Sequence, residues 1–281
     1  MRSVNGNAQG SKSWFITGAS SGLGREWAGA ALERGDRVAA AARSADRLDE
    51  LAQRYGDAVL PIALDVTDRP AVSAAVARAH QEFGRLDVVV NCAGAGHYGA
   101  VEELTEDEAR GLMDTNFFGA LWVTQAALPF LRKQRGGHML MVSSVGGVMA
   151  GSSLGIYHAS KWALEALSES LSKEVADFGI KVTILEPTGY RTGAEAAAGR
   201  SAPHPDYRRE HDRRVERREF VASREGKPEA TAAAVLAVVD AEQPPLRLLL
   251  GAGTLELVTD VYEARLGTWR DWAEVSTAAH G

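Results

Sequence analysis

The chain has 281 residues, of which 45% are hydrophobic and 24% are charged, a composition that fits a folded domain with a sizeable core and excludes global disorder. The formal net charge of −6 argues against binding to nucleic acids or anionic membranes, because both partners require a basic face. The single cysteine, Cys92, excludes an internal disulfide and a cysteine zinc site, and it favours a reducing, cytoplasmic compartment.

Residues 1–12 are small and polar, and we expect them to form a flexible tail without the apolar stretch of a signal peptide. No apolar run in the chain approaches the ~18 residues of a membrane-spanning helix. Residues 13–281 are expected to fold as a single domain.

Short apolar runs alternate with helical patterns along this domain. In chain order, the expected strands are residues 13–17, 37–41, 59–64, 87–91, 137–143, 181–186 and 246–250, and the expected helices are residues 25–34, 46–55, 68–83, 105–135 (bent near Asn116) and 156–177. Strands that alternate with helices form parallel βαβ units, which right-handed crossovers join into a doubly wound α/β sheet. We therefore expect about seven parallel strands with helices on both faces.

Residues 190–228 interrupt this pattern with a charged insertion, which we expect to be a substrate lid. The signs of its charges alternate over residues 208–218, which favours a solvated helix face; a lid that binds phosphate or carboxylate is the alternative. The apolar residues of this insertion are the expected substrate contacts: Tyr190, Tyr207, Phe220 and Val221.

Three glycines with the spacing G-x-x-x-G-x-G lie between the first strand and the first helix. Glycines at this position allow backbone amides to approach a pyrophosphate at a helix N-terminus, as in Rossmann-like sheets; a tight turn is the alternative. The predicted dinucleotide-binding residues of this turn are Gly18, Ser20, Ser21, Gly22, Leu23 and Gly24.

The residues after the second strand predict the cofactor preference. A carboxylate at the position of Ala42 would bind a ribose 2′-hydroxyl, but here Arg43 and Ser44 follow, and a guanidinium with a hydroxyl suits a 2′-phosphate. Asp65, followed by Val66, is placed to accept from the adenine amino group; a role as the N-cap of the next helix is the alternative. We therefore predict that NADP(H) is preferred and that NAD(H) is possible.

Tyr157 and Lys161 are four residues apart in a strong helical pattern and therefore share a helix face. An ammonium group beside a phenol is expected to lower the pKa of the tyrosine, which makes it a suitable acid/base near neutral pH. Ser144 lies thirteen residues before Tyr157, at the end of the fifth predicted strand.

With these residues, the chain resembles the short-chain dehydrogenase/reductase family over residues 13–192. The motifs that carry the resemblance are TGxxxGxG at residues 17–24, NNAG at residues 91–94 with Cys92 in place of the second asparagine, Asn116, Ser144, Tyr-x-x-x-Lys at Tyr157 and Lys161, and PGxxxT at residues 187–192.

The resemblance implies a role for each catalytic residue. Tyr157 donates a proton to a carbonyl oxygen or takes one from an alcohol, and Ser144 hydrogen-bonds the same oxygen. Lys161 lowers the tyrosine pKa and holds the nicotinamide ribose, and Asn116 steadies a water that links Lys161 to solvent. Further cofactor contacts implied by the resemblance are Asn91, Ala93, Gly94, Pro187, Thr188, Gly189 and Thr192.

Two positions depart from the family pattern. Cys92 replaces an asparagine, and a buried thiol is expected to be tolerated there as a small hydrophobe. Thr188 replaces the glycine after Pro187, where the added side chain either shifts the cofactor or narrows the pocket.

Other polar and aromatic residues receive weaker interpretations. The histidines show no metal-binding spacing, so no metal is expected. His97 is expected to face solvent, with a substrate contact as the alternative, and His158 is assigned no role. The resemblance makes the helix at 156–177 a dimer face, so we expect a homodimer or homotetramer; the aromatic residues at 268–272 either dock on a neighbouring subunit or close the pocket.

The sequence thus predicts an NADP(H)-dependent oxidoreductase, a ketoreductase or alcohol dehydrogenase that acts on a small-molecule carbonyl or secondary alcohol. Three alternatives stay open: an NAD(H)-preferring enzyme of the same fold, an epimerase or dehydratase that retains its cofactor, and a non-catalytic NADP-binding sensor.

Overall fold

The computed structural model describes residues 10–222 and 224–281. The strands are β1 (Ser13–Thr17), β2 (Arg37–Ala42), β3 (Val59–Ala63), β4 (Val88–Asn91), β5 (His97–Tyr98), β6 (Gly137–Val142), β7 (Ile180–Pro187), β8 (Gly199–Arg200) and β9 (Arg247–Leu250). The α-helices are α1 (Gly22–Glu33), α2 (Asp49–Tyr55), α3 (Arg69–Phe83), α4 (Glu106–Met113), α5 (Gly119–Gln134), α6 (Gly155–Glu174), α7 (Arg208–Ala222), α8 (Thr231–Asp240), α9 (Thr254–Asp271) and α10 (Ala273–Ala278).

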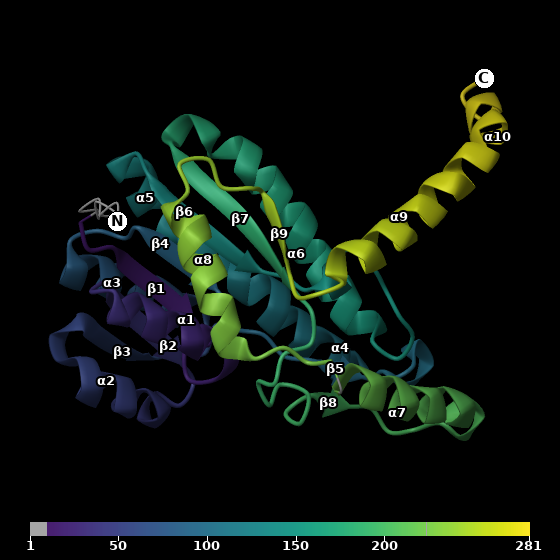
Figure 1. The fold of residues 1–281 in the computed structure, drawn as a ribbon, viewed down its shortest axis with the longest axis horizontal. Coiled ribbons are helices and arrows are strands. Elements are labelled where there is room, and N and C mark those ends of the chain that lie inside the picture. Colours follow the sequence, from purple (N-terminus) through teal and green to yellow (C-terminus); the bar gives the residue numbers. More distant parts are fainter. Residues whose placement is uncertain (1–9, 223) are drawn as a thin grey trace, which may run out of the picture.

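Seven strands form one parallel sheet in the order β3-β2-β1-β4-β6-β7-β9. The order reverses between β1 and β4, and crevices beside such a reversal are where open α/β sheets bind ligands. The predicted doubly wound sheet is therefore confirmed (Figure 1).

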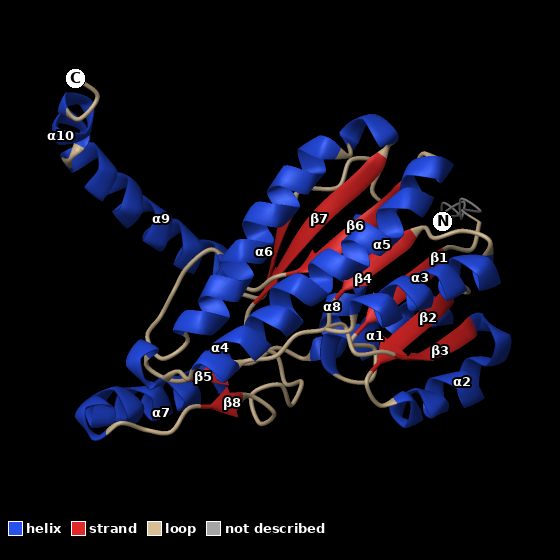
Figure 2. Cartoon of the chain, turned by 180° about the vertical axis from the view of Figure 1, so that it is seen from behind, coloured by secondary structure: helices blue, strands red, loops and turns tan. Residues whose placement is uncertain are grey.

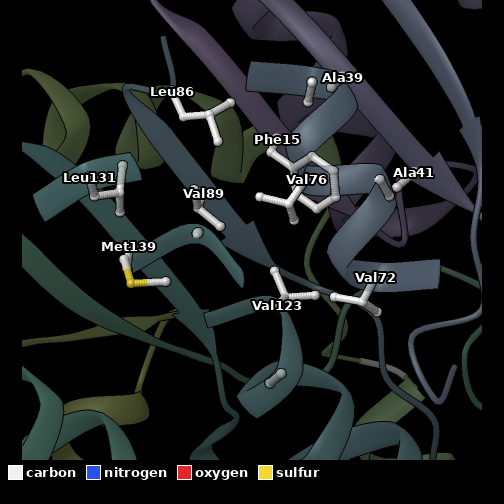
Figure 3. Packing of buried hydrophobic residues seen from close by; sticks show 14 of the residues in the cluster. Phe15, Ala39, Ala41, Val72, Val76, Leu86, Val89, Val123, Leu131 and Met139 are labelled. Atoms are coloured by element: carbon white, nitrogen blue, oxygen red, sulfur yellow. The ribbon is translucent and has the colours of Figure 1, made fainter. Parts of the chain in front are cut away.

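Two hydrophobic clusters cover the two faces of this sheet. Phe15 of β1 points into the cluster made with α3, α5 and α6, whereas its neighbours Trp14 and Ile16 point into the cluster made with α1 and α8. Successive side chains of a strand face opposite ways, so a strand buried on both faces is apolar throughout. Figure 2 shows α5 and α6 over one face, and Figure 3 shows Phe15, Val76 and Val123 meeting there.

The single long helix expected at 105–135 is interrupted where a bend was expected. Between α4 and α5 the chain makes a π-helical turn, Asp114–Phe118, which contains the buried Asn116. Such turns insert one residue into a helix and frequently lie at functional sites. The turn aims the Asn116 side chain back toward the end of β4.

The segment after β7 differs most from the sequence expectation. The expected lid, residues 190–228, contains β8, which pairs in parallel with β5, and the helix α7. Three further helices, α8, α9 and α10, lie in regions for which no helix was predicted. α8 packs on α1, where the Trp27 indole donates to the Thr231 hydroxyl over 2.7 Å. No helix in the described part of the chain is both long and apolar enough to cross a membrane.

Candidate active site

The glycine turn after β1 forms an open backbone cradle. Gly18 and Gly22 have φ angles of 69° and 55°, the left-handed region that favours glycine, and a Cβ on Gly24 would lie 2.5 Å from the Gly18 carbonyl oxygen. Ser21, the N-cap of α1, makes no side-chain capping bond, so amides of the first turn are left for a ligand. These features fit a dinucleotide pyrophosphate.

The turn is tied to the strands on either side of it. The Thr17 hydroxyl accepts from the amides of Cys92 and Ala93 over 3.0 and 3.1 Å, which joins the turn to the end of β4. The Ala19 amide donates to the Ala41 carbonyl over 3.1 Å, which places the turn beside the end of β2. The exposed Arg43 follows two residues after Ala41, together with Ser44.

Asp65 lies just after β3. The Thr67 amide donates to its carboxylate over 2.9 Å, and this hydrogen bond is the main reason that the pKa of the carboxyl is lowered. The Arg43 guanidinium is close enough to lower it further. The alternative role of Asp65 as a helix cap is wrong, because Asp68 caps α3 by accepting from the Ala71 amide over 2.9 Å. Val66, the residue after Asp65, is buried against the start of α5.

Ser144, Tyr157 and Lys161 come together at the carboxyl ends of β6 and β7. The Ser144 hydroxyl lies beside the Tyr157 side chain, accepts from the Gly146 amide over 3.0 Å and donates to the Pro187 carbonyl over 3.3 Å. The Lys161 ammonium lies 6.0 Å from the centre of the Tyr157 ring. The sequence therefore identified the residues that meet here.

The prediction that Lys161 lowers the pKa of Tyr157 is wrong for this structure. Burial raises the pKa of Tyr157, and the neighbouring Ser144 hydroxyl offsets this only in part. Burial also lowers the pKa of Lys161 to about 8, and the ammonium donates to the Val142 carbonyl over 2.8 Å. Spacing on a helix brought the two side chains to one face, but the lysine is directed at the backbone and not at the phenol.

Asn116 connects α6 to the loop after β4. Its amide nitrogen donates to the Ala95 carbonyl and the Ser160 hydroxyl over 2.9 and 3.0 Å, and its oxygen accepts from the Ala95 amide over 2.8 Å. A Cβ on Gly94 would lie 3.3 Å from the Asn116 oxygen and 3.5 Å from the Lys161 nitrogen. Gly94 thus lets the loop pass close to Lys161.

The Asn91 side chain, at the end of β4, is directed into the core toward α5. It is buried and donates to Thr124 and to the Met141 sulfur over 3.3 and 3.2 Å. Cys92 packs against the hydrophobic cluster near α1, and burial raises the pKa of its thiol to about 11, so it behaves as an apolar side chain.

Thr188, which replaces the family glycine, is bonded to the strand β9. Its amide and its hydroxyl both donate to the Leu250 carbonyl, over 3.0 and 3.3 Å, so its side chain is held by the turn after β9. Gly189 and Tyr190 follow, and Thr192 lies against the glycine turn, where a Cβ on Gly22 would approach its side chain to 3.0 Å.

Two histidines have roles that the sequence did not reveal. His158 is buried; its Nδ1 donates to the Gly146 carbonyl over 3.0 Å and its Nε2 accepts from the Gly151 amide over 3.1 Å, so it holds the loop after Ser144. His97 is only 7% exposed, which overturns the expected solvent-facing position, and its Nε2 lies 2.9 Å from the Ser201 hydroxyl. In the sequence, the position of His158 next to Tyr157 was the one feature that could have indicated its role, and nothing indicated that His97 is buried.

A cleft of about 230 Å³ opens beside this site, between β5 and the lid segment. Its lining residues are Tyr98, Gly99, Glu103, Ser153, Arg200, Ser201, Pro203, His211 and Arg214. The expected apolar contacts are not among them: Tyr207 donates to Glu102 over 2.7 Å, and Tyr190 packs beside Gly226. The side chains of Phe220 and Val221 lie outside the described part of the chain.

Comparison with known proteins gives consistent matches. The family model described as short chain dehydrogenase matches residues 12–202. "Oxidoreductase BOA17" of Botryotinia fuckeliana is 40% identical over 95% of this chain and 99% of its own length. The 3-ketodihydrosphingosine reductase of Bacteroides thetaiotaomicron is 36% identical over 84% of this chain and 87% of its own.

A solved structure agrees with these relatives. The crystal structure of a short-chain dehydrogenase from Streptomyces avermitilis superposes with a TM-score of 0.89 at 39% identity, covering 96% of this chain and 98% of that one. The match in sequence and in backbone extends well beyond the motifs themselves. The chain therefore belongs to the short-chain dehydrogenase/reductase family and is an NAD(P)-dependent oxidoreductase.

Proposed function

We propose that this protein is an NADP(H)-dependent ketoreductase or alcohol dehydrogenase that acts on a carbonyl or a secondary alcohol. The observation that carries the proposal is the convergence of two hydroxyls, those of Ser144 and Tyr157, with Lys161 on the next turn of the helix. One relative is named as the reductase of a keto compound, which supports the same reaction class.

Each catalytic side chain has a separate task in this proposal. Bound nicotinamide supplies the hydride in reduction and accepts it in oxidation. Tyr157 donates its phenolic proton to the carbonyl oxygen as that oxygen gains charge, and Ser144 hydrogen-bonds the same oxygen. Lys161 presents a cation to the ribose and to the phenolate that forms, and Asn116 keeps the loop at Gly94 against it.

The cofactor-binding residues are the glycine turn together with the ends of β2, β3, β4 and β7. Arg43 supports NADP(H) over NAD(H), because this exposed arginine follows the end of β2, which lies beside the glycine turn, with Ala42 in place of an acid. Arg43→Ala is therefore expected to weaken NADPH binding by about 10- to 150-fold, the effect of one lost charge-assisted pair, and to leave NADH binding nearly unchanged.

Fluorescence titration with both cofactors measures this. The matched control is Arg47→Ala, which removes the same charge from an exposed position four residues away and is expected to leave both affinities unchanged. An equal loss of NADPH and NADH affinity in Arg43→Ala would show that Arg43 does not bind the 2′-phosphate.

The proposal extends to assembly and location. We propose a homodimer or homotetramer, with α6 contributing its 37%-exposed Trp162 to the interface. We also propose that it works in the cytoplasm, where its one cysteine stays reduced.

The experiment that tests the reaction is a panel of ketones, aldehydes and secondary alcohols assayed with NADPH or NADP⁺. Consumption of NADPH with at least one carbonyl compound is expected. If NADPH binds tightly and nothing in a broad panel reacts, the non-catalytic sensor becomes the better description of this chain.

A further inference from the structure

Two arginines of the lid segment lie against one tyrosine ring in the cleft. The guanidinium carbons of Arg200 in β8 and Arg214 in α7 lie 5.5 and 5.4 Å from the centre of the Tyr98 ring. Among the side chains that the structure describes, neither guanidinium forms an ion pair with a carboxylate; Arg200 donates to the carbonyls of Ala198 and Glu195 over 3.1 and 3.4 Å. Two like charges held at one ring repel each other, and a bound anion would offset that repulsion.

The acidic side chains around the cleft already have partners. Glu103 accepts from the His211 ring over 2.7 Å and from the amides of His204 and Ala100 over 2.8 and 2.7 Å. The Glu103 carboxylate therefore connects the lid segment, through His204 and His211, to the rest of the domain.

The other two acids are engaged in the same way. The Glu195 carboxylate pairs with Arg218 over 2.6 Å, and the Glu210 carboxylate accepts from the hydroxyls of Ser152 and Ser153 over 2.6 and 3.2 Å. Among the cleft-lining side chains that the structure describes, Arg200 and Arg214 are therefore the guanidinium groups that face the Tyr98 ring without a carboxylate partner.

The cleft lies beside the start of α6, the helix that carries Tyr157. The Gly99 amide donates to the Ser153 carbonyl over 3.0 Å, and Gly99 pairs with Leu154, the residue before α6. Tyr157 lies in the first turn of that helix, and Tyr98 is close enough to affect its ionisation. The volume of about 230 Å³ is enough for a short chain and one anionic group.

We propose that this cleft binds the carboxylate end of the substrate, so that the enzyme reduces keto acids. Arg200 and Arg214 bind the carboxylate with their planar, two-pronged donors, while Ser144 and Tyr157 bind the ketone oxygen. This inference rests on the proposed carbonyl reduction, and it adds the class of substrate.

The test compares medium-chain keto acids with their methyl esters, which keep the ketone and lose the charge. Wild type is expected to favour the acid in kcat/KM by at least about 10-fold. Arg214→Gln and Arg200→Gln are each expected to lower this acid-to-ester ratio by about 10- to 100-fold, mainly through KM for the acid. Arg209→Gln, an exposed arginine on the same helix, is the matched control and is expected to leave the ratio unchanged. Equal use of acid and ester by wild type, or an unchanged ratio in both cleft variants, would overturn the proposal.

A binding measurement separates failure of the inference from failure of the reaction. Octanoate and methyl octanoate are titrated by calorimetry into wild type saturated with NADP⁺. Binding of octanoate that methyl octanoate does not reproduce, and that Arg214→Gln loses, supports the anion site even if no ketone is reduced. Turnover of neutral ketones without octanoate binding would refute the anion site and leave the proposed reaction standing.

Discussion

At the scale of single residues, the active site depends on burial as much as on proximity. Lys161 is buried and Tyr157 is half-buried, so the phenol keeps its proton more firmly and the ammonium holds its proton less firmly than in solution. The Lys161 ammonium also has a backbone partner, the Val142 carbonyl. In this structure the lysine is therefore held by the backbone and not by the phenol.

The first prediction separates proton transfer from binding. Tyr157→Phe keeps the ring and removes the hydroxyl, so it is expected to preserve the fold and NADPH affinity while turnover falls by about 10²- to 10⁴-fold. Lys161→Ala is expected to lower both turnover and NADPH affinity, because it removes a charge and a ribose contact together. Stopped-flow NADPH oxidation and fluorescence titration measure the two quantities. Wild-type turnover in Tyr157→Phe would refute its role as the acid.

His158 is a positioning residue for the loop that carries Ser144. Because its Nε2 accepts from Gly151 and its Nδ1 donates to Gly146, it needs the neutral ring, and burial lowers its pKa accordingly. His158→Phe is expected to lower kcat by about 10-fold or more, since a displacement of about 1 Å at a catalytic group is costly, while NADPH affinity is retained. His80→Phe, a histidine stacked on Phe130 in α5, is the control. Unchanged kcat in His158→Phe would show that the loop holds its own shape.

At the scale of elements, the sheet edge is joined to α6 by a cluster of acids around one arginine. Arg247 of β9 contacts Glu165 of α6 at 3.0 Å and Glu186 of β7 at 3.6 Å. Burial and the neighbouring Glu165 raise the pKa of Glu186 to about 7. The folded chain thus binds this proton more tightly than the unfolded chain, in which the pKa stays near 4.5.

This cluster gives a prediction for stability against pH. The contribution of Glu186 to stability is full below about pH 4.5 and is lost as the pH rises through about 7. Glu186→Gln cannot ionise, so its stability relative to wild type is expected to rise by up to about 3 kcal/mol between pH 5 and pH 8, at ~1.4 kcal/mol per pKa unit. Urea denaturation at both pH values measures this difference.

The matched control for that prediction is Glu169→Gln. Arg247 and Lys173 lower the pKa of Glu169, so this carboxylate is ionised across the whole range and its variant should differ from wild type by a constant amount. A constant difference for Glu186→Gln as well would show that Glu186 is charged at pH 5.

At the scale of the whole molecule, the chain ends in an arm. The helix α9, which is about 27 Å long, begins after β9 and projects away from the sheet and its helices, together with α10 (Figures 1 and 2). Trp269 and Trp272 near its end are each 63% exposed, and Leu255 at its start is 65% exposed. Because the arm points away from its own cleft, it does not close the pocket of its own chain.

An apolar arm of this kind predicts contact with a second copy of the chain. The double variant Trp269→Ser with Trp272→Ser is expected to lower the molar mass in sedimentation equilibrium toward 30.0 kDa, with the NADPH affinity unchanged. Glu263→Gln, on the same helix, is the control. An unchanged mass in the tryptophan variant would place the subunit interface elsewhere, with α6 as the next surface to test.

The sequence by itself determined the doubly wound sheet, because strands buried on both faces read as short apolar runs and their helices have regular spacing. It also identified the Ser144, Tyr157 and Lys161 set and the glycine turn, since these depend on local spacing and on backbone geometry near one strand end. Tertiary structure decided what spacing does not encode. It directs the Lys161 ammonium to a backbone carbonyl and the Asn91 amide into the core. It also provides the Leu250 carbonyl that accepts from the Thr188 hydroxyl. It also brought Arg200 and Arg214 to Tyr98, more than a hundred residues earlier in the chain. The physical reason is that a local pattern indicates which side of a helix or strand is buried. The hydrogen-bond partners, the solvation and the protonation of a side chain depend instead on which distant elements pack against it.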